Sequence, residues 1–271
     1  KRLTQGPVMP TMLRFAVPMI LGDLLQQCYN IADTLIVGRF LGADALAAVG
    51  SAYTLMVFLT SIILGLCMGS SAFFSMQYGA GNTERLKKSF FLSFVLIGAI
   101  TLLLNLIVVW KLGLIIRLLQ IPAEIQGLMR DYLWIIFMGL IATFLYNYFA
   151  NLLRAVGNSM VPLIFLAFSA VLNIILDLVF VLIFHWGVKG AAGATVFSQY
   201  VSGVGILLYY YVKFPHLRVE RCHMKWDSSI LKEITGLSVL TCMQQSIMNL
   251  GILMVQGLVN SFGTAVMAAF A

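Results

Sequence analysis

Long apolar segments separated by short polar loops follow one another along the whole chain. A helix crosses the roughly 30 Å hydrocarbon core of a bilayer with about 20 mostly apolar residues. The segments of that length are 12–38, 46–76, 89–112, 131–153, 160–184, 188–212 and 234–260, and an eighth begins near Thr264. This pattern predicts an all-α integral membrane protein that crosses the membrane several times.

The longest polar stretch, residues 213–231, divides these segments into two groups. The sequence RFLGADALAA at 39–48 aligns with NSFGTAVMAA at 260–269, so that the glycines match and an Ala-Ala pair matches an Ala-Ala pair. A repeat after six helices places both copies in the same orientation. We therefore expect a six-helix N-lobe at 1–212, a cytoplasmic linker at 213–231, and the start of a second, parallel six-helix bundle at 232–271.

Basic residues are unevenly distributed between the two predicted sides of the membrane. Most of the 17 Lys and Arg lie on the N-terminal flank and in the second, fourth and sixth loops. These are Lys1, Arg2, Arg14, Arg85, Lys87, Lys88, Arg154, Lys213, Arg218, Arg221, Lys225 and Lys232. Because cytoplasmic loops are enriched in Lys and Arg, we expect a cytoplasmic N-terminus. The net charge of +7 thus reflects topology, and nucleic acid is not an expected partner.

A polar stripe runs along the first predicted helix. Asp23, Gln26, Asn30 and Asp33 fall within roughly 80° of one another when each residue advances by about 100°. Ionisable residues within membrane helices usually face a bundle interior or a wet cavity, because exposure to lipid is costly. The stripe therefore favours transport, with Asp23, Gln26 and Asn30 as cavity-lining or substrate-contacting residues.

Three other predicted helices bring polar residues to the depth of Asp33. Asn173 and Asp177 are four residues apart on the fifth helix, and Tyr132 and Thr195 lie in the outer halves of the fourth and sixth helices. Two carboxylates in a poorly solvated cavity can share one proton. The oxygens of Asp33, Asn173, Asp177 and Thr195 also suit a hard cation such as sodium.

Several residues have more than one interpretation. Asp33 and Asp177 can couple transport to an ion or merely hydrogen-bond to fix helix packing. Asn147 and Asn151 on the fourth helix can line the cavity or bond between helices. Pro18 leaves the carbonyl of Arg14 without its helical partner, so the first helix is expected to bend there as a hinge.

Five sequence motifs are similar to those of the multidrug and toxic compound extrusion (MATE) family. They are ADTLIVGRFLGADALAAVG at 32–50, MQYGAGN at 76–82, RAVGNSMVP at 154–162, LNIILD at 172–177 and WGVKGAAGATVFSQ at 186–199. The acidic residue late in the first helix resembles the branch related to the DNA-damage-inducible F proteins. The resemblance implies twelve helices in two six-helix lobes and drug export driven by protons or sodium. It also implies an N-lobe cation and proton network of Asp33, Tyr132, Asn173, Asp177 and Thr195, and a bend at Pro18.

Other function classes have weaker support. A lipid-linked oligosaccharide flippase of related fold is the closest rival, although it would be expected to place Arg or Lys in its cavity for a diphosphate. A membrane-embedded enzyme would need a catalytic set such as HExxH, which the sequence lacks. His216, Cys222 and His223 fit no common zinc-ligand spacing. We therefore expect no organic cofactor and no transition-metal site.

The combined interpretation is a secondary active multidrug exporter that exchanges cationic or amphipathic compounds for protons or sodium. We expect a monomeric, multi-pass protein of a bacterial plasma membrane, in contact with its lipids. The chain begins with Lys1, so its true N-terminus is expected upstream.

Overall fold

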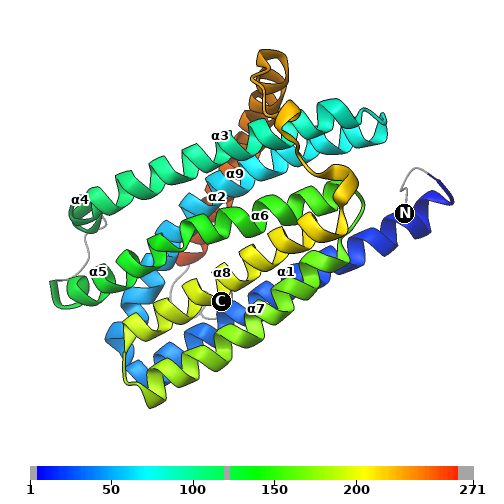
Figure 1. The fold of residues 1–271 in the computed structure, drawn as a ribbon. Helices are drawn as coiled ribbons and strands as arrows, with labels where there is room; N and C mark the ends of the chain where they lie inside the picture. Colours follow the sequence, from blue (N-terminus) through cyan, green and yellow to red (C-terminus); the bar gives the residue numbers. More distant parts are fainter. Residues whose placement is uncertain (1–4, 119–122, 262–271) are drawn as a thin grey trace.

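The computed structural model describes residues 5–118 and 123–261, and every regular element in these ranges is helical (Figure 1). Five helices are long and apolar enough to cross a membrane, or six when one bent pair is taken as a single span. The elements are α1 (Val8–Leu41), α2 (Ala43–Gly79), α3 (Thr83–Trp110), α4 (Leu112–Leu118), α5 (Ala123–Met138), α6 (Leu140–Ala155), α7 (Met160–Leu178), the π-helical turn Val179–Ile183, α8 (Val188–Lys213), the 3-10 turns Pro215–Leu217 and Arg221–His223, and α9 (Ser228–Ser261). The all-α membrane fold expected from the sequence is confirmed.

The fourth predicted span, 131–153, is wrong as a single helix. It corresponds to α5 and α6, which are bent by 41° at Gly139. The hydroxyl of Tyr200 on α8 donates to the carbonyl of Met138 at this break, at 2.7 Å. Because a glycine allows close approach and a side chain from a neighbouring helix satisfies the backbone, the bend is locally stabilised.

The predicted seventh span, residues 234–260, lies within α9. Among the described residues, α9 is not one of the five helices counted as long and apolar enough to cross a membrane. Its polar positions include Thr241, Gln244, Gln245 and Asn249. The predicted eighth helix near Thr264 lies outside the described residues.

The helices form one bundle around α2, which packs against α3, α5, α6 and α9. α1 packs against α7, and α8 lies against α6 and α7 (Figure 1). The chain reverses between α1 and α2 at Gly42, whose φ of 91° is accessible to glycine at little cost. This reversal places the last turns of α1 and the first turns of α2 at the same end of the bundle.

The half of the bundle nearest to the 3-10 turns has an aromatic core. The rings of Phe74 and Phe149 pack against Tyr148, and those of Phe90 and Tyr210 pack against Phe74 and Phe149. The Tyr148 hydroxyl donates to the carbonyl of Phe90 at 2.7 Å. Aromatic pairs of this kind add stability beyond their buried area. The opposite end of the lobe contains the polar residues that the sequence singles out.

Candidate ion-coupling site

Three helices bring the predicted polar residues together at the end of the bundle opposite to the linker. Asp33 lies two turns before the end of α1, Asp177 in the last turn of α7, and Thr195 in the second turn of α8. Asp177 lies two residues before the π-helical turn Val179–Ile183. Such turns are frequent at functional sites, because they re-aim side chains within a helix.

The carboxyl groups of Asp33 and Asp177 lie within hydrogen-bonding reach of each other. Asp177 is fully buried, and Asp33 is half-buried with its Oδ1 atom hidden from solvent. One oxygen of each group, Oδ1, has no hydrogen-bond partner among the described residues. Buried polar oxygens of native proteins are nearly always satisfied, so these two atoms are the ones left for a proton shared between the carboxyl groups or for a cation.

Asn173 links this pair to α8. In the amide orientation that satisfies both of its polar atoms, its nitrogen donates to Asp177 Oδ2 at 2.9 Å and its oxygen accepts from the Thr195 N–H at 3.1 Å. The Thr195 hydroxyl donates to the carbonyl of Ala191 at 3.1 Å. Together, Asp33, Asn173, Asp177 and Thr195 supply carboxylate, amide and hydroxyl oxygens, which are the ligands that hard cations prefer.

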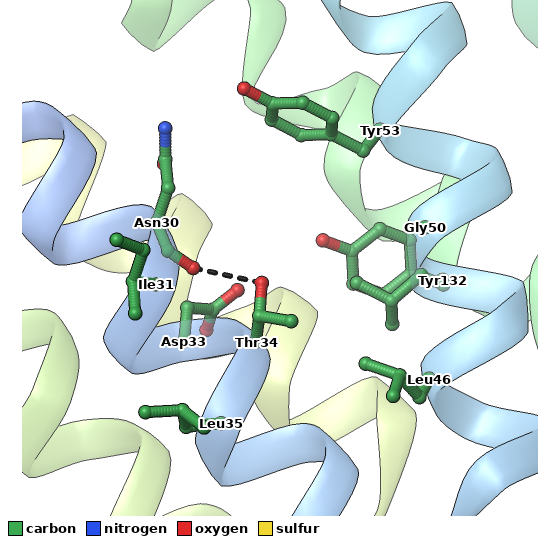
Figure 2. A pocket seen from close by; sticks show the side chains of 10 residues that line it. Asn30, Ile31, Asp33, Thr34, Leu35, Leu46, Gly50, Tyr53 and Tyr132 are labelled. Carbon is green, nitrogen blue, oxygen red and sulfur yellow. Dashed lines mark hydrogen bonds between the residues drawn. The ribbon is translucent and has the colours of Figure 1, made fainter. Parts of the chain in front are cut away.

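Tyr132 connects the carboxyl pair to a pocket of about 340 Å³ between α1, α2 and α5. Asp33 and Tyr132 both line the pocket, and the Tyr132 hydroxyl points into the space in front of α1 (Figure 2). The other lining residues are Asn30, Ile31, Thr34, Leu35, Leu46, Val49, Gly50 and Tyr53. A mainly apolar pocket with a few convergent polar groups is typical of a small-molecule site.

The remaining predicted cavity residues are arranged differently. Asn30 lines the pocket, and the Gln26 amide donates to the side-chain oxygen of Asn30 at 3.5 Å, a long hydrogen bond. Asp23 is exposed two turns nearer to the start of α1. The amides of Asn147 and Asn151 donate to carbonyls of their own helix one turn earlier, at 2.9 and 2.8 Å, rather than to another helix.

Three site residues were missed in the sequence. Tyr29 on α1 lies near Thr195 and Asp33, and Thr34 and Tyr53 line the pocket. Tyr29 lies three residues after Gln26 and four before Asp33, so helical spacing alone could have added it to the stripe. Tyr53 could not be found in this way, because its place depends on how α2 packs against α1.

Pro18 is buried inside α1, and the helix is continuous through it. The hydroxyl of Ser159, just before α7, donates to the carbonyl of Phe15 at 3.0 Å. A neighbouring side chain therefore supports the backbone in the turn that the proline weakens.

The fold defines the class of the protein, a multi-pass all-helical membrane protein. Residues 18–179 match the model of the MatE family, and the chain belongs to this family. It is 32% identical over 270 residues to a probable multidrug resistance protein, YpnP, of Bacillus subtilis. That alignment covers 98% of the chain and 60% of the relative, so the chain spans about three fifths of the relative's length.

Solved structures support the same fold. The chain is similar to a MATE protein solved in a bent conformation, with a TM-score of 0.87 and 24% identity, and to one solved in a straight conformation, with a TM-score of 0.84 and 26% identity. Each match covers 95% of this chain and 58% of the solved one.

Proposed function

We propose that the whole protein is a secondary active multidrug exporter and that this chain supplies its first lobe and the start of the second. It exchanges cationic or amphipathic organic compounds for protons or sodium ions by alternating access. The observation that carries the proposal is the buried contact between Asp33 and Asp177 beside an apolar pocket. The curated relative from Bacillus subtilis, named a probable multidrug resistance protein, supports the substrate class.

The carboxyl pair supplies the coupling chemistry. Two carboxyl groups in hydrogen-bonding contact hold one proton between them, because two bare carboxylates at this separation repel each other in a poorly solvated site. Sodium is the alternative ion, bound by the free Oδ1 atoms of Asp33 and Asp177 with Asn173 and Thr195. Either ion lowers the negative charge of the pair by one unit, and the two ions compete for the same oxygens.

The proposed cycle couples this site to the pocket through α1. Asp33 belongs to both, so binding of an ion to Asp33 and Asp177 changes the charge that an organic cation meets in the pocket. A ligand shifts a conformational equilibrium only through its different affinities for the two shapes. Pro18 is the position at which α1 bends between them, and the bent and straight structures of a similar protein give precedent for two shapes.

The placement of the protein follows from the basic loops. We propose a bacterial plasma-membrane protein with its N-terminus in the cytoplasm, acting as a monomer and without an organic cofactor. The lipid-linked oligosaccharide flippase remains the rival function. Among the described residues that line the pocket, the polar ones are Asn30, Asp33, Thr34, Tyr53 and Tyr132, and none is a Lys or Arg that could hold a diphosphate.

Transport by the full-length protein in everted membrane vesicles tests this function. A proton gradient and a sodium gradient are imposed separately, and the uptake of a fluorescent organic cation is recorded. We expect one gradient to drive uptake and the other to have little effect. Uptake that responds to neither gradient would contradict secondary antiport.

A further inference from the structure

A second cluster of polar side chains lies far from the carboxyl pair, in the segment between α8 and α9. Glu220, Cys222 and His223 lie in or beside the 3-10 turn Arg221–His223, and their ligand atoms all lie within 4.8 Å of one another. The His223 side chain is 3% exposed, whereas Glu220 and Cys222 are exposed. Glu84, at the start of α3, approaches the same imidazole from the other side.

The two ring nitrogens of His223 have different partners. Nε2 lies 3.2 Å from the Glu84 carboxylate, and Nδ1 accepts from the backbone N–H of Glu220 at 3.2 Å. These contacts place the ring proton on Nε2, and the Nδ1 lone pair accepts from the Glu220 N–H. The Cys222 sulfur lies beside the ring, 3.6 Å from Nδ1, 3.8 Å from Nε2 and 3.9 Å from Glu220 Oε2.

We propose that Glu220, Cys222 and His223 form a binding site for a divalent cation of the zinc class. Zinc binds thiolate sulfur at about 2.3 Å and imidazole nitrogen at about 2.0–2.1 Å with tetrahedral geometry, which separates these two ligand atoms by roughly 3.5 Å. The Nδ1 to sulfur distance of 3.6 Å has this spacing. A mixed set of nitrogen, sulfur and carboxylate ligands favours zinc over the hard cations calcium and magnesium.

Glu84 has the role of an orienting carboxylate. A histidine that binds a metal through one nitrogen usually donates its other N–H to a carboxylate, which fixes the tautomer and the ring orientation. The contact between Nε2 and Glu84 supplies this arrangement before any metal binds. Binding then needs only a small shift of the Glu220 N–H away from Nδ1 and loss of the Cys222 thiol proton.

The sequence does not predict this site. The spacing of His216, Cys222 and His223 fits no common zinc-ligand pattern, and Glu84 is distant in the chain. In the structure, the His216 ring lies beside Phe214, with 6.0 Å between ring centroids. The contacts of His223 also have an explanation that needs no metal, because Glu220 and His223 form a capping box for the 3-10 turn. That interpretation accounts for the buried ring but gives no role to the exposed sulfur of Cys222.

The consequence of binding is a tie between the linker and α3. Next to the cluster, Arg85 of α3 forms an ion pair of 2.6 Å with Glu233 in α9. A cation at Glu220, Cys222 and His223 would hold the linker against Glu84 and so restrain the first turns of α9. The site thus lies where the two predicted bundles are joined.

Metal binding to the purified chain in detergent tests the proposal, with an affinity tag that contains no histidine. Zinc affinity is measured by competition with a chromogenic chelator, and cobalt serves as the spectroscopic probe for thiolate ligation. We expect one zinc per chain and a sulfur-to-cobalt charge-transfer band. Cys222→Ser should abolish the band and weaken zinc binding at least tenfold, and Glu220→Gln should also weaken binding at least tenfold.

The controls separate this site from other cysteines and histidines. Cys28→Ser removes another exposed thiol, and His216→Ala removes the other imidazole of the same segment. Both should retain wild-type affinity and the cobalt band. Because His223 is buried, the exposed ligands Cys222 and Glu220 carry the test. No stoichiometric zinc binding, or binding that survives Cys222→Ser and Glu220→Gln unchanged, would overturn the proposal.

Discussion

Gly139, at the break between α5 and α6, lies against Gln199 of α8 so closely that a Cβ atom on Gly139 would be 3.0 Å from the Gln199 side-chain oxygen. The same Cβ would lie 3.0 Å from a methyl group of Val196. Thr195, which hydrogen-bonds to Asn173, lies on the same helix, about one turn or less before Val196 and Gln199. The bend of α5–α6 is therefore packed on the helix that holds one part of the candidate ion site.

Gly139→Ala should destabilise the protein, because the added methyl group would crowd the Gln199 and Val196 side chains of α8 and the carbonyl of Ile136. Overpacking of this kind typically costs about 1–3 kcal/mol. Gly193→Ala on α8 is the matched control, since a Cβ there meets no atom within 4 Å. Thermal unfolding in detergent should show a lower midpoint for Gly139→Ala only, and equal midpoints would contradict the close contact.

A second close contact joins α2 and α9. A Cβ on Gly69 would clash with the backbone of Ser238, which cannot move aside as a side chain would. We expect Gly69→Ala to separate the helices locally, whereas Gly236→Ala, with no atom within 4 Å, should not. In a background lacking Cys28 and Cys222, maleimide labelling of Cys242 should become faster in Gly69→Ala. Unchanged labelling would argue against the packing of α9 on α2.

Pro18→Ala should leave the pocket intact but stiffen α1. Alanine restores the N–H that can bond to the carbonyl of Arg14, so bending at this position becomes more costly. We expect the full-length variant to bind an organic cation with wild-type affinity and to transport it more slowly. Loss of binding together with transport, or unchanged transport, would exclude Pro18 as the hinge.

Much of the fold follows from the sequence because a bilayer imposes helix length and apolar composition. The juxtaposition of Asp33 with Asp177 also follows, since the direction and length of each span fix the depth of its residues. The bend at Gly139 was missed because hydropathy does not distinguish a straight span from a broken one. What stabilises the bend comes from α8, more than fifty residues later in the chain.

The contacts of individual side chains were less predictable. Asn147 and Asn151 bond within α6, although their spacing is equally suited to bonds between helices. The pairing of His223 with Glu84 depends on the path of the linker back to α3. Periodicity describes one helix at a time, so partners from different helices emerge only from packing.

The central claim is that Asp33 and Asp177 together carry the coupling ion. The most direct test is gradient-driven efflux by Asp33→Asn and Asp177→Asn in the full-length protein, at expression and thermal stability matched to wild type. Asp44→Asn, which neutralises an exposed carboxylate in the first turn of α2, serves as the control. The account predicts that both site variants lose gradient-driven efflux while Asp44→Asn retains it. Wild-type efflux rates in Asp33→Asn and Asp177→Asn would contradict the claim.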